Sequence, residues 1–206
     1  MKSILIANRK GGCGKTMVAI TLAAALAGRG GTVGLADADP QKSALRWLKH
    51  RPDGVAPIRA VDWTNPSDFG EAPKKLDWLV IDAPGALTGD RAEALIAEAE
   101  AVITPVLPSI FDVDSTRRFL KEIEHVKRVR KGKVGVSLIA NRTRAGRGAD
   151  RLGAFFEKLG QEPLAWITER TAYPELAAQG LALFDKPQKA YAPLKEQWAP
   201  VLAALD

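Results

Sequence analysis

The sequence predicts an α/β protein in which a mostly parallel, twisted sheet carries helices on both faces. Short, wholly apolar runs of strand length alternate along the chain with longer amphipathic runs of helical period. Strands separated by helices pair in parallel and are covered on both sides, which explains why the strand-like runs are apolar throughout. No long linker divides the chain, so residues 1–206 are expected to form one domain.

The strands are expected where apolar and β-branched residues run without interruption, at residues 3–7, 32–36, 78–81, 101–105 and 134–140. The helices are expected where apolar residues recur at helical spacing, at residues 15–27, 43–50, 115–130, 149–159 and 193–205. Gly28 and Gly30 close the first helix, and Gly132 closes the third. Residues 52–73 contain four prolines, so a strand at 57–63 is expected to lie at an edge of the sheet.

Composition points to a protein of the cytoplasm. One cysteine excludes a disulfide framework and fits a reducing compartment. The first residues run directly into a strand-like segment without the apolar core and small-residue cleavage site of a signal peptide. No apolar run approaches the ~20 residues that a membrane-spanning helix needs.

Charge is distributed unevenly. The formal net charge is +6, and residues 117–151 hold twelve Lys and Arg against three acids, a net of 12 − 3 = +9, which leaves −3 for the rest. Such a local excess is either a solvated helix face or a surface for a polyanion. The basic residues fall into two groups, one before and one after the strand at 134–140.

A glycine-rich loop, NRKGGCGKTM at residues 8–17, follows the first strand and precedes the first helix. In this context successive backbone N–H groups can surround a phosphate at the helix N-terminus. Lys15 would reach the β- and γ-phosphates, and the Thr16 hydroxyl would be a ligand of Mg²⁺. The loop residues expected to bind the nucleotide are Gly11, Gly12, Cys13, Gly14, Lys15, Thr16 and Met17.

The loop departs from the general phosphate-binding pattern at one position, because Arg9 stands where that pattern has glycine. With Lys10 directly before two glycines, KGGCGKT resembles the deviant Walker A loop of the ParA/MinD superfamily of P-loop ATPases. The resemblance implies that Lys10 crosses a dimer interface and contacts the phosphates held by the other subunit. Its role would be that of a cation delivered in trans to the transferring phosphoryl group.

Two acidic segments follow strand-like runs. GLADADPQ, residues 34–41, is either an Asp-rich turn closed by Pro40 or a group of carboxylates at the ligand-binding edge of the sheet. It resembles the DxDPQ segment of the same superfamily, which implies that Asp39 acts on the attacking water and Asp37 supports Mg²⁺. DWLVIDAPG, residues 77–85, has the Walker B form, in which Asp82 would hold a Mg²⁺-bound water. Gly85 would lie near the γ-phosphate.

Later segments also resemble the superfamily. PVLPSIFDVDS, residues 105–115, is similar to the family's P-x-x-P-S-x-x-D segment beside the active site. Asn141 and Arg142 stand where the family contacts the adenine base. TERTAYPELAAQG, residues 168–180, is similar to a stretch that follows the last core strand of ParA proteins. The short chain is most similar to the small ParF-type partition ATPases.

The resemblance implies a ParA-type ATPase that uses ATP and Mg²⁺, with Lys10, Lys15 and Asp39 in catalysis and Thr16, Asp37 and Asp82 at the metal. An ATP-dependent homodimer would bind DNA non-specifically on the nucleoid and be released when a small ParB-like or adaptor protein stimulates hydrolysis. The cargo would be a plasmid, a chromosome region or a protein assembly. The alternatives are a dethiobiotin-synthetase-like metabolic ligase and a MinD-like membrane ATPase, although the C-terminal tail lacks the basic face of a membrane-binding helix.

Overall fold

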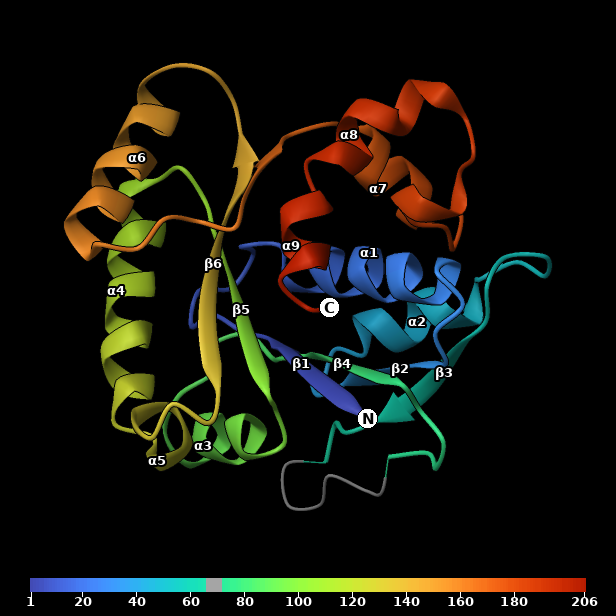
Figure 1. Cartoon of the computed structure of the whole chain (residues 1–206), viewed down its shortest axis with the longest axis horizontal. Coiled ribbons are helices and arrows are strands. Elements are labelled where there is room, and N and C mark those ends of the chain that lie inside the picture. Colours follow the sequence, from blue (N-terminus) through green and yellow to red (C-terminus); the bar gives the residue numbers. More distant parts are fainter. Residues whose placement is uncertain (66–71) are drawn as a thin grey trace.

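The computed structural model describes residues 1–65 and 72–206, within which seven strands form one parallel sheet. The strand order is β3-β2-β4-β1-β5-β6-β7, so the chain starts in the middle of the sheet and builds outward to both edges (Figure 1). All neighbouring strands run parallel. The strands are β1 (Lys2–Ile6), β2 (Val33–Asp37), β3 (Ile58–Asp62), β4 (Trp78–Asp82), β5 (Ala101–Val106), β6 (Gly135–Thr143) and β7 (Ala165–Thr168). The expected fold class is confirmed.

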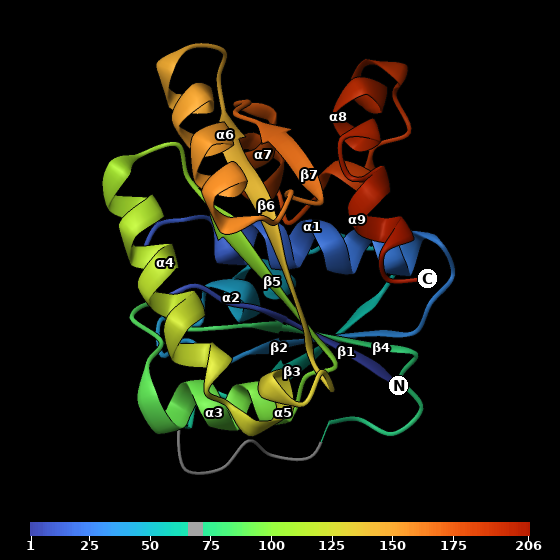
Figure 2. The same cartoon turned by 60° about the vertical axis from the view of Figure 1, so that its left-hand side comes forward.

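Helices cover both faces of the sheet (Figures 1 and 2). One layer contains α1 (Lys15–Gly28), α2 (Ser43–Lys49), α7 (Ala172–Ala177), α8 (Ala192–Glu196) and α9 (Ala199–Ala203). The other layer contains α3 (Gly89–Ala97), α4 (Ile110–Glu124), α5 (Lys127–Arg130) and α6 (Arg147–Leu159). Two single-turn 3₁₀ helices, η1 (Leu183–Asp185) and η2 (Lys189–Tyr191), join α7 to α8.

The strands divide their side chains between two cores because successive residues point to opposite faces. In β1, Ile4 and Ile6 enter the core under α1, whereas Leu5 enters the core under α3 and α4. Val80 and Ile81 divide in the same way. The edge strand β3 is exposed at most of its positions, as expected for residues 57–63, whereas Pro66 of the proline-rich stretch lies outside the described residues.

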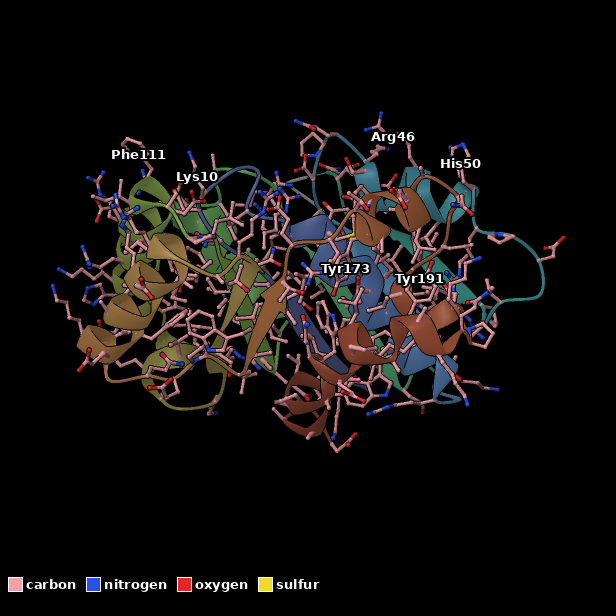
Figure 3. All side chains as sticks on the ribbon, turned by 90° about the horizontal axis from the view of Figure 1, so that it is seen from above. Lys10, Arg46, His50, Phe111, Tyr173 and Tyr191 are labelled. Atoms are coloured by element: carbon pink, nitrogen blue, oxygen red, sulfur yellow. The ribbon has the colours of Figure 1, made fainter. Side chains whose placement is uncertain are left out.

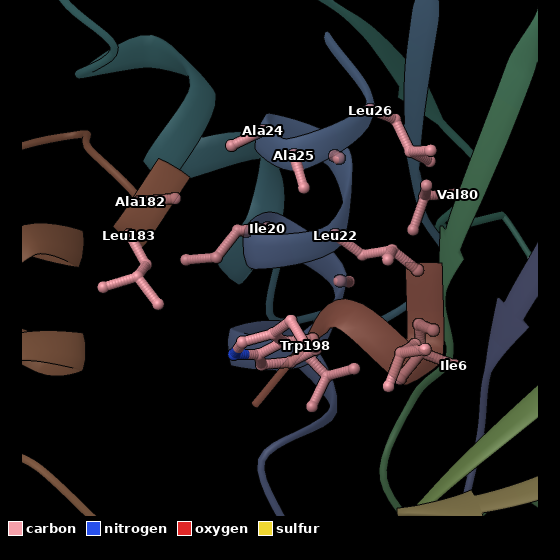
Figure 4. Packing of buried hydrophobic residues seen from close by; sticks show 14 of the residues in the cluster. Ile6, Ile20, Leu22, Ala24, Ala25, Leu26, Val80, Ala182, Leu183 and Trp198 are labelled. Carbon is pink, nitrogen blue, oxygen red and sulfur yellow. The ribbon is translucent and has the colours of Figure 1, made fainter. Parts of the chain in front are cut away.

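Helix α1 is buried along nearly its whole length, which explains its Ala- and Leu-rich sequence. The C-terminal segments close over it: Trp198 and Leu183 pack with Ile20 and Leu22 of α1 (Figure 4). The Trp198 indole N–H also donates to the Tyr173 hydroxyl at 3.0 Å. A helix beside the sheet and under a second helical layer has no face left for polar residues.

Two expected helices differ from those observed. The helix expected at 115–130 begins earlier, at Ile110, where the Ser109 side chain accepts the Asp112 N–H at 3.1 Å as an N-cap. It also ends at Glu124, because Val126 adopts an extended conformation before the short helix α5. The helix expected at 193–205 is divided into α8 and α9, since Pro200 has no N–H to continue a helix from α8.

Apart from the two 3₁₀ helices, α3, β7 and α7 are absent from the expected set. They are short, with nine, four and six residues, so few apolar repeats mark them in the sequence. Among the described residues, no helix is long and apolar enough to cross a membrane.

The turn after α7 is clamped to the end of α2. The Arg51 guanidinium pairs with Asp185 at 2.8 Å, and both side chains are almost fully buried. Gly180 lies in the turn after α7 and has φ +69°. It is so close to the end of α2 that an added Cβ would stand 2.0 Å from the His50 carbonyl oxygen. Only glycine combines this backbone conformation with this close approach.

Replacing Gly180 with Ala is therefore expected to lower the free energy of unfolding by about 2 kcal/mol or more, since both the positive φ and the backbone contact oppose a side chain. Gly153 is the matched control, because it lies within α6 with no atom within 4 Å of an added Cβ. Gly153→Ala is expected to be neutral or slightly stabilising. Chemical denaturation would test both variants, and equal stabilities would contradict the clamp.

Candidate nucleotide-binding site

The loop between β1 and α1 has the geometry of an anion-binding turn. Gly12 and Gly14 adopt φ +79° and +95°, and the N-cap residue Gly14 has no side chain to cap the N–H groups that open α1. An added Cβ at Gly14 would lie 2.5 Å from Asn141 Nδ2, so a side chain is excluded there. Free N–H groups at a helix N-terminus and a narrow glycine turn together suit a phosphate.

Lys15 is held within this loop. Its side chain is 6% exposed at the start of α1, and its Nζ donates to the Lys10 carbonyl oxygen at 3.1 Å. The loop backbone thus turns back over the ammonium group. The Lys10 side chain is exposed instead, and within the described residues its ammonium has neither an ion pair nor a hydrogen bond.

Two aspartates end adjacent strands at the same level, because β2 and β4 pair with Asp37 opposite Asp82. Both are fully buried. Asp37 accepts the backbone N–H of Asp39 and of Leu45, each at 3.0 Å, so it ties the turn after β2 to α2. Burial raises the pKa of Asp37 against the opposing effect of these N–H groups.

Asp82 is the least compensated charge of the site. Neither of its carboxylate oxygens has a hydrogen-bond partner of ordinary geometry within the described residues. Burial raises its pKa to about 7, and the neighbouring Thr16 hydroxyl and the Lys15 ammonium oppose this shift in part. A buried carboxylate without a partner is costly unless a proton or a cation compensates it.

Asp39 connects the acidic turn to the segment after β4. One of its oxygens accepts the Gly85 N–H at 3.2 Å, and the other accepts the Gln41 N–H at 2.9 Å. The Gly85 segment also contacts the phosphate-binding loop, since an added Cβ at Gly85 would meet the Gly11 Cα at 3.9 Å. The Asp39 and Gly85 segments, far apart in sequence, therefore meet at this loop.

A cavity of about 610 Å³ opens over this arrangement. Its lining includes Gly11, Gly12, Gly14, Lys15, Thr16, Met17, Asp39, Gly85 and Arg142. Cys13 does not line it: the side chain is buried and its carbonyl oxygen accepts from Asn141 Nδ2 at 2.8 Å. Asp37 and Asp82 lie beneath the surface rather than in the cavity lining.

A second cavity, of about 430 Å³, lies between the start of α1 and the ends of β6 and β7. Asn141 and Arg142 line it, together with Met17, Tyr173 and Trp198. Arg142 has a positive φ of 50°, and its N–H donates to Asn141 Oδ1 at 3.0 Å. The residues expected at the adenine base thus share this cavity with Tyr173 and Trp198, which were not expected there. The stretch at 168–180 was the available sequence signal for Tyr173, whereas no motif marked Trp198.

The donor set around Asp82 fits Mg²⁺. Thr16 and the two strand-end aspartates offer hard oxygen donors, and the Asp82 oxygens are free of other partners in the described chain. No group of three or more His, Cys, Asp or Glu gathers into a metal site among the described residues. Mg²⁺ is commonly held by one or two carboxylates together with substrate phosphates, so such a group is not required.

The two basic groups lie at opposite ends of β6. The first, comprising Lys127, Arg128, Arg130, Lys131 and Lys133, belongs to α5 and the turn before β6. The second, comprising Arg142, Arg144, Arg147 and Arg151, lies at the end of β6 and on α6. Arg144 of the second group is paired with Glu169.

Residues 4–184 match the family model described as the CobQ/CobB/MinD/ParA nucleotide binding domain. The chain belongs to this family. The expected membership of the ParA/MinD superfamily is therefore confirmed.

Curated relatives within the family have positioning roles in their names. The Maintenance of carboxysome distribution protein A of Halothiobacillus neapolitanus is 30% identical over 189 residues, covering 89% of this chain and 87% of the relative. The Chromosome-partitioning ATPase Soj of Thermus thermophilus is 32% identical over 158 residues, covering 62% and 63% of the two chains. The solved structure of apo McdA from Cyanothece has the same fold, with a TM-score of 0.81, 21% identity and full coverage of both chains.

The buried Asp82 predicts an unusual pH dependence. Its ordinary pKa is 3.8 and its pKa in the folded chain is about 7, so the folded state binds this proton more tightly than the unfolded chain. Stability is therefore lost as the pH rises from about 4 to 7. Without nucleotide and Mg²⁺, Asp82→Asn is expected to be more stable than the wild type at pH 8, by on the order of a few kcal/mol, with the difference shrinking toward pH 4.

The control is Asp62→Asn. Asp62 is exposed and pairs with Lys42, and the Lys42 hydrogen bond lowers its pKa to about 2, so its substitution is expected to be slightly destabilising at neutral pH. Thermal unfolding of both variants across the pH range measures the effect. If the stabilities of the wild type and of Asp82→Asn changed in parallel with pH, the raised pKa of Asp82 would be contradicted.

Proposed function

We propose that this family member is an ATPase of the ParA positioning type, which hydrolyses ATP with Mg²⁺ and assembles as an ATP-dependent homodimer. The observation that carries the proposal is the meeting of Lys15, Thr16, Asp39 and Gly85 around one cavity, above the buried carboxylate of Asp82, which the described residues compensate only in part. A triphosphate with Mg²⁺ supplies both charges that this arrangement lacks: anions for the lysines and a cation for the carboxylates.

Each residue of the site has a role that its position supports. Lys15 binds the β- and γ-phosphates, and the N–H groups of the loop surround them. Thr16 and Asp82, with Asp37 beside it, would hold Mg²⁺, which would supply positive charge next to the phosphates. Asp39 orients the attacking water, and the hydrogen bond from Gly85 holds its carboxylate at the cavity wall. Asn141 and Arg142 contact the base in the second cavity.

Lys10 has a different environment from Lys15, and this difference supports a role toward another subunit. Its ammonium is exposed at the rim of the site, although its own carbonyl oxygen accepts from Lys15. Figure 3 shows Lys10 at an outer edge of the molecule. A lysine at this place can reach the phosphates of a facing subunit and stabilise charge that develops there.

The polyanion partner that we propose is DNA. The two basic groups at the ends of β6 together carry nine Lys and Arg, and phosphate contacts of this kind bind DNA without reading its sequence. Binding by the ATP dimer would place the protein on the nucleoid. A small ParB-like or adaptor protein would stimulate hydrolysis and release the dimer, so that repeated cycles move a cargo. The names of the two curated relatives support a cargo of either a protein assembly or a chromosome.

The structure disfavours a membrane-anchor role for helix α9. The apolar side chains of the C-terminal helix α9, with Trp198 before it, are buried in the core beside α1. An amphipathic membrane anchor would need these side chains at the surface. The positioning roles named for both curated relatives likewise favour this function over a metabolic ligase.

Replacing Lys10 with Gln is expected to abolish dimerisation driven by a non-hydrolysable triphosphate and Mg²⁺, because the partner's phosphates lose their second cation. Binding of the nucleotide to the monomer is expected to stay at the wild-type affinity. Lys15→Gln is the matched comparison, since it removes a cation from the protein's own nucleotide and should weaken both binding and dimerisation. Analytical ultracentrifugation and fluorescent-nucleotide titration separate these effects; a Lys10→Gln dimer of normal affinity would exclude the role in trans.

DNA association is expected to require the triphosphate and to weaken by at least about tenfold as salt rises from roughly 50 to 200 mM, because binding releases counterions. Co-sedimentation with DNA of random sequence measures this. Charge reversal of Lys127 with Lys131, compared with reversal of Arg147 with Arg151, would locate the contact in one basic group or the other. Association that does not respond to salt would refute the proposal.

A further inference from the structure

Two large apolar side chains are exposed at the start of α4. Ile110 is 53% exposed and Phe111 is 75% exposed, the highest value among the large apolar residues that the structure describes. Along α4, Phe111 is followed at helical spacing by Ser115 and the exposed Arg118, so it stands on the polar face of the helix. A large aromatic on a solvated face has no role in the core of this chain.

The fold imposes this exposure. Ser109 caps α4 and also donates its hydroxyl to the Asp112 carboxylate. The next residues, Asp112 and Val113, are buried, and Pro108 is packed against Gly148 of α6, where an added Cβ would lie 3.1 Å away. With residues fixed on both sides of it, Phe111 cannot turn into the core without unwinding the first turn of α4.

The Phe111 segment is tied to the phosphate-binding loop through Asn8, which is completely buried. The Asn8 side-chain amide donates to the Pro105 carbonyl oxygen at 2.9 Å and to the Thr116 hydroxyl at 2.8 Å. Its Oδ1 accepts the Lys10 N–H at 3.3 Å. The loop that carries Lys10 and the segment that carries Phe111 are therefore held together, and Figure 3 shows both side chains along the same outer edge of the molecule.

We propose that Phe111, supported by Ile110, is the apolar anchor of the contact between two copies of this chain in the triphosphate-bound state. The inference rests on the proposed function, because Lys10 must approach the phosphates of a facing copy. Any copy that brings phosphates to Lys10 also approaches Phe111, since Asn8 fixes the two segments to each other. A second copy would thus bring phosphates to the Lys10 ammonium and cover the exposed ring of Phe111 at the same time.

The charges of the site cannot by themselves provide a durable contact. An exposed cation and a polyanion attract one another with an energy that salt screens, whereas a buried aromatic ring removes apolar area from water and commonly dominates interface energetics. In a two-fold symmetric dimer each contact occurs twice, so two Phe111 side chains would flank the two nucleotides. The division of roles is that Lys10 senses the triphosphate and Phe111 supplies the adhesion.

The test measures the dimer dissociation constant by analytical ultracentrifugation with a non-hydrolysable triphosphate and Mg²⁺. Phe111→Ala is expected to weaken the dimer by at least about tenfold, whereas Phe111→Leu, which keeps an apolar side chain, restores part of the loss. Nucleotide affinity of the monomer and its thermal unfolding are expected to be unchanged, because the ring is exposed. Leu159→Ala is the matched control: this residue is also exposed, at 37%, but stands at the end of α6.

The outcomes separate this inference from the function on which it rests. A wild type that stays monomeric with the triphosphate refutes the homodimer itself. A wild type that dimerises through Lys10, together with a Phe111→Ala variant of equal dimer affinity, overturns the anchor and leaves the proposed function standing. The anchor is equally overturned if Phe111→Ala dimerises normally but no longer responds to a stimulating protein, which would assign this surface to that protein.

Discussion

The site depends on one constraint: three neighbouring parallel strands end at the same level. Pairing places Ile6 of β1 opposite Asp82 of β4, and Asp82 opposite Asp37 of β2. The segments that follow these three residues are the phosphate-binding loop, the acidic turn and the Gly85 turn, so the register of the sheet alone brings them together. A shift of one residue in any strand would turn its last side chain to the opposite face.

This convergence leaves the chain with charges that it does not compensate by itself. Asp37 is neutralised in part by two backbone N–H groups, but the Asp82 oxygens have no such partners in the described residues. Lys15 donates to a carbonyl oxygen of its own loop, and the exposed Lys10 ammonium has no ion pair or hydrogen bond among the residues that the structure describes. The two lysines are complementary to the negative triphosphate, and the buried Asp82 carboxylate is complementary to the metal that accompanies it. The fold thus gives up some stability at the carboxyl ends of its central strands in order to bind that ligand.

Much of this arrangement could be predicted from the sequence because its signals are local. A strand, a glycine turn and a helix in succession identify the loop, and an apolar run that ends in Asp identifies the strand ends. Apolar spacing alone does not predict the start of α4, whose local signal is the cap that Ser109 forms with Asp112. The helix expected at 193–205 ignores Pro200, which divides it; the long-range contacts that follow, of Gln197 with the Thr168 N–H at 2.9 Å and of Trp198 with the core, have no local signal. Contacts between segments distant in the chain, such as that of Asp39 with Gly85, cannot be predicted from the spacing of apolar residues in the sequence.

The most direct test of the account is a crystal structure with a non-hydrolysable triphosphate and Mg²⁺. The account predicts two facing subunits, with the metal about 2.1 Å from the Thr16 hydroxyl oxygen and bound to Asp82 directly or through water. The Lys10 ammonium of each subunit should lie within hydrogen-bonding distance of the phosphates in the other. A nucleotide held in the cavity while Lys10 points into bulk solvent, remote from any second subunit's phosphates, would contradict it.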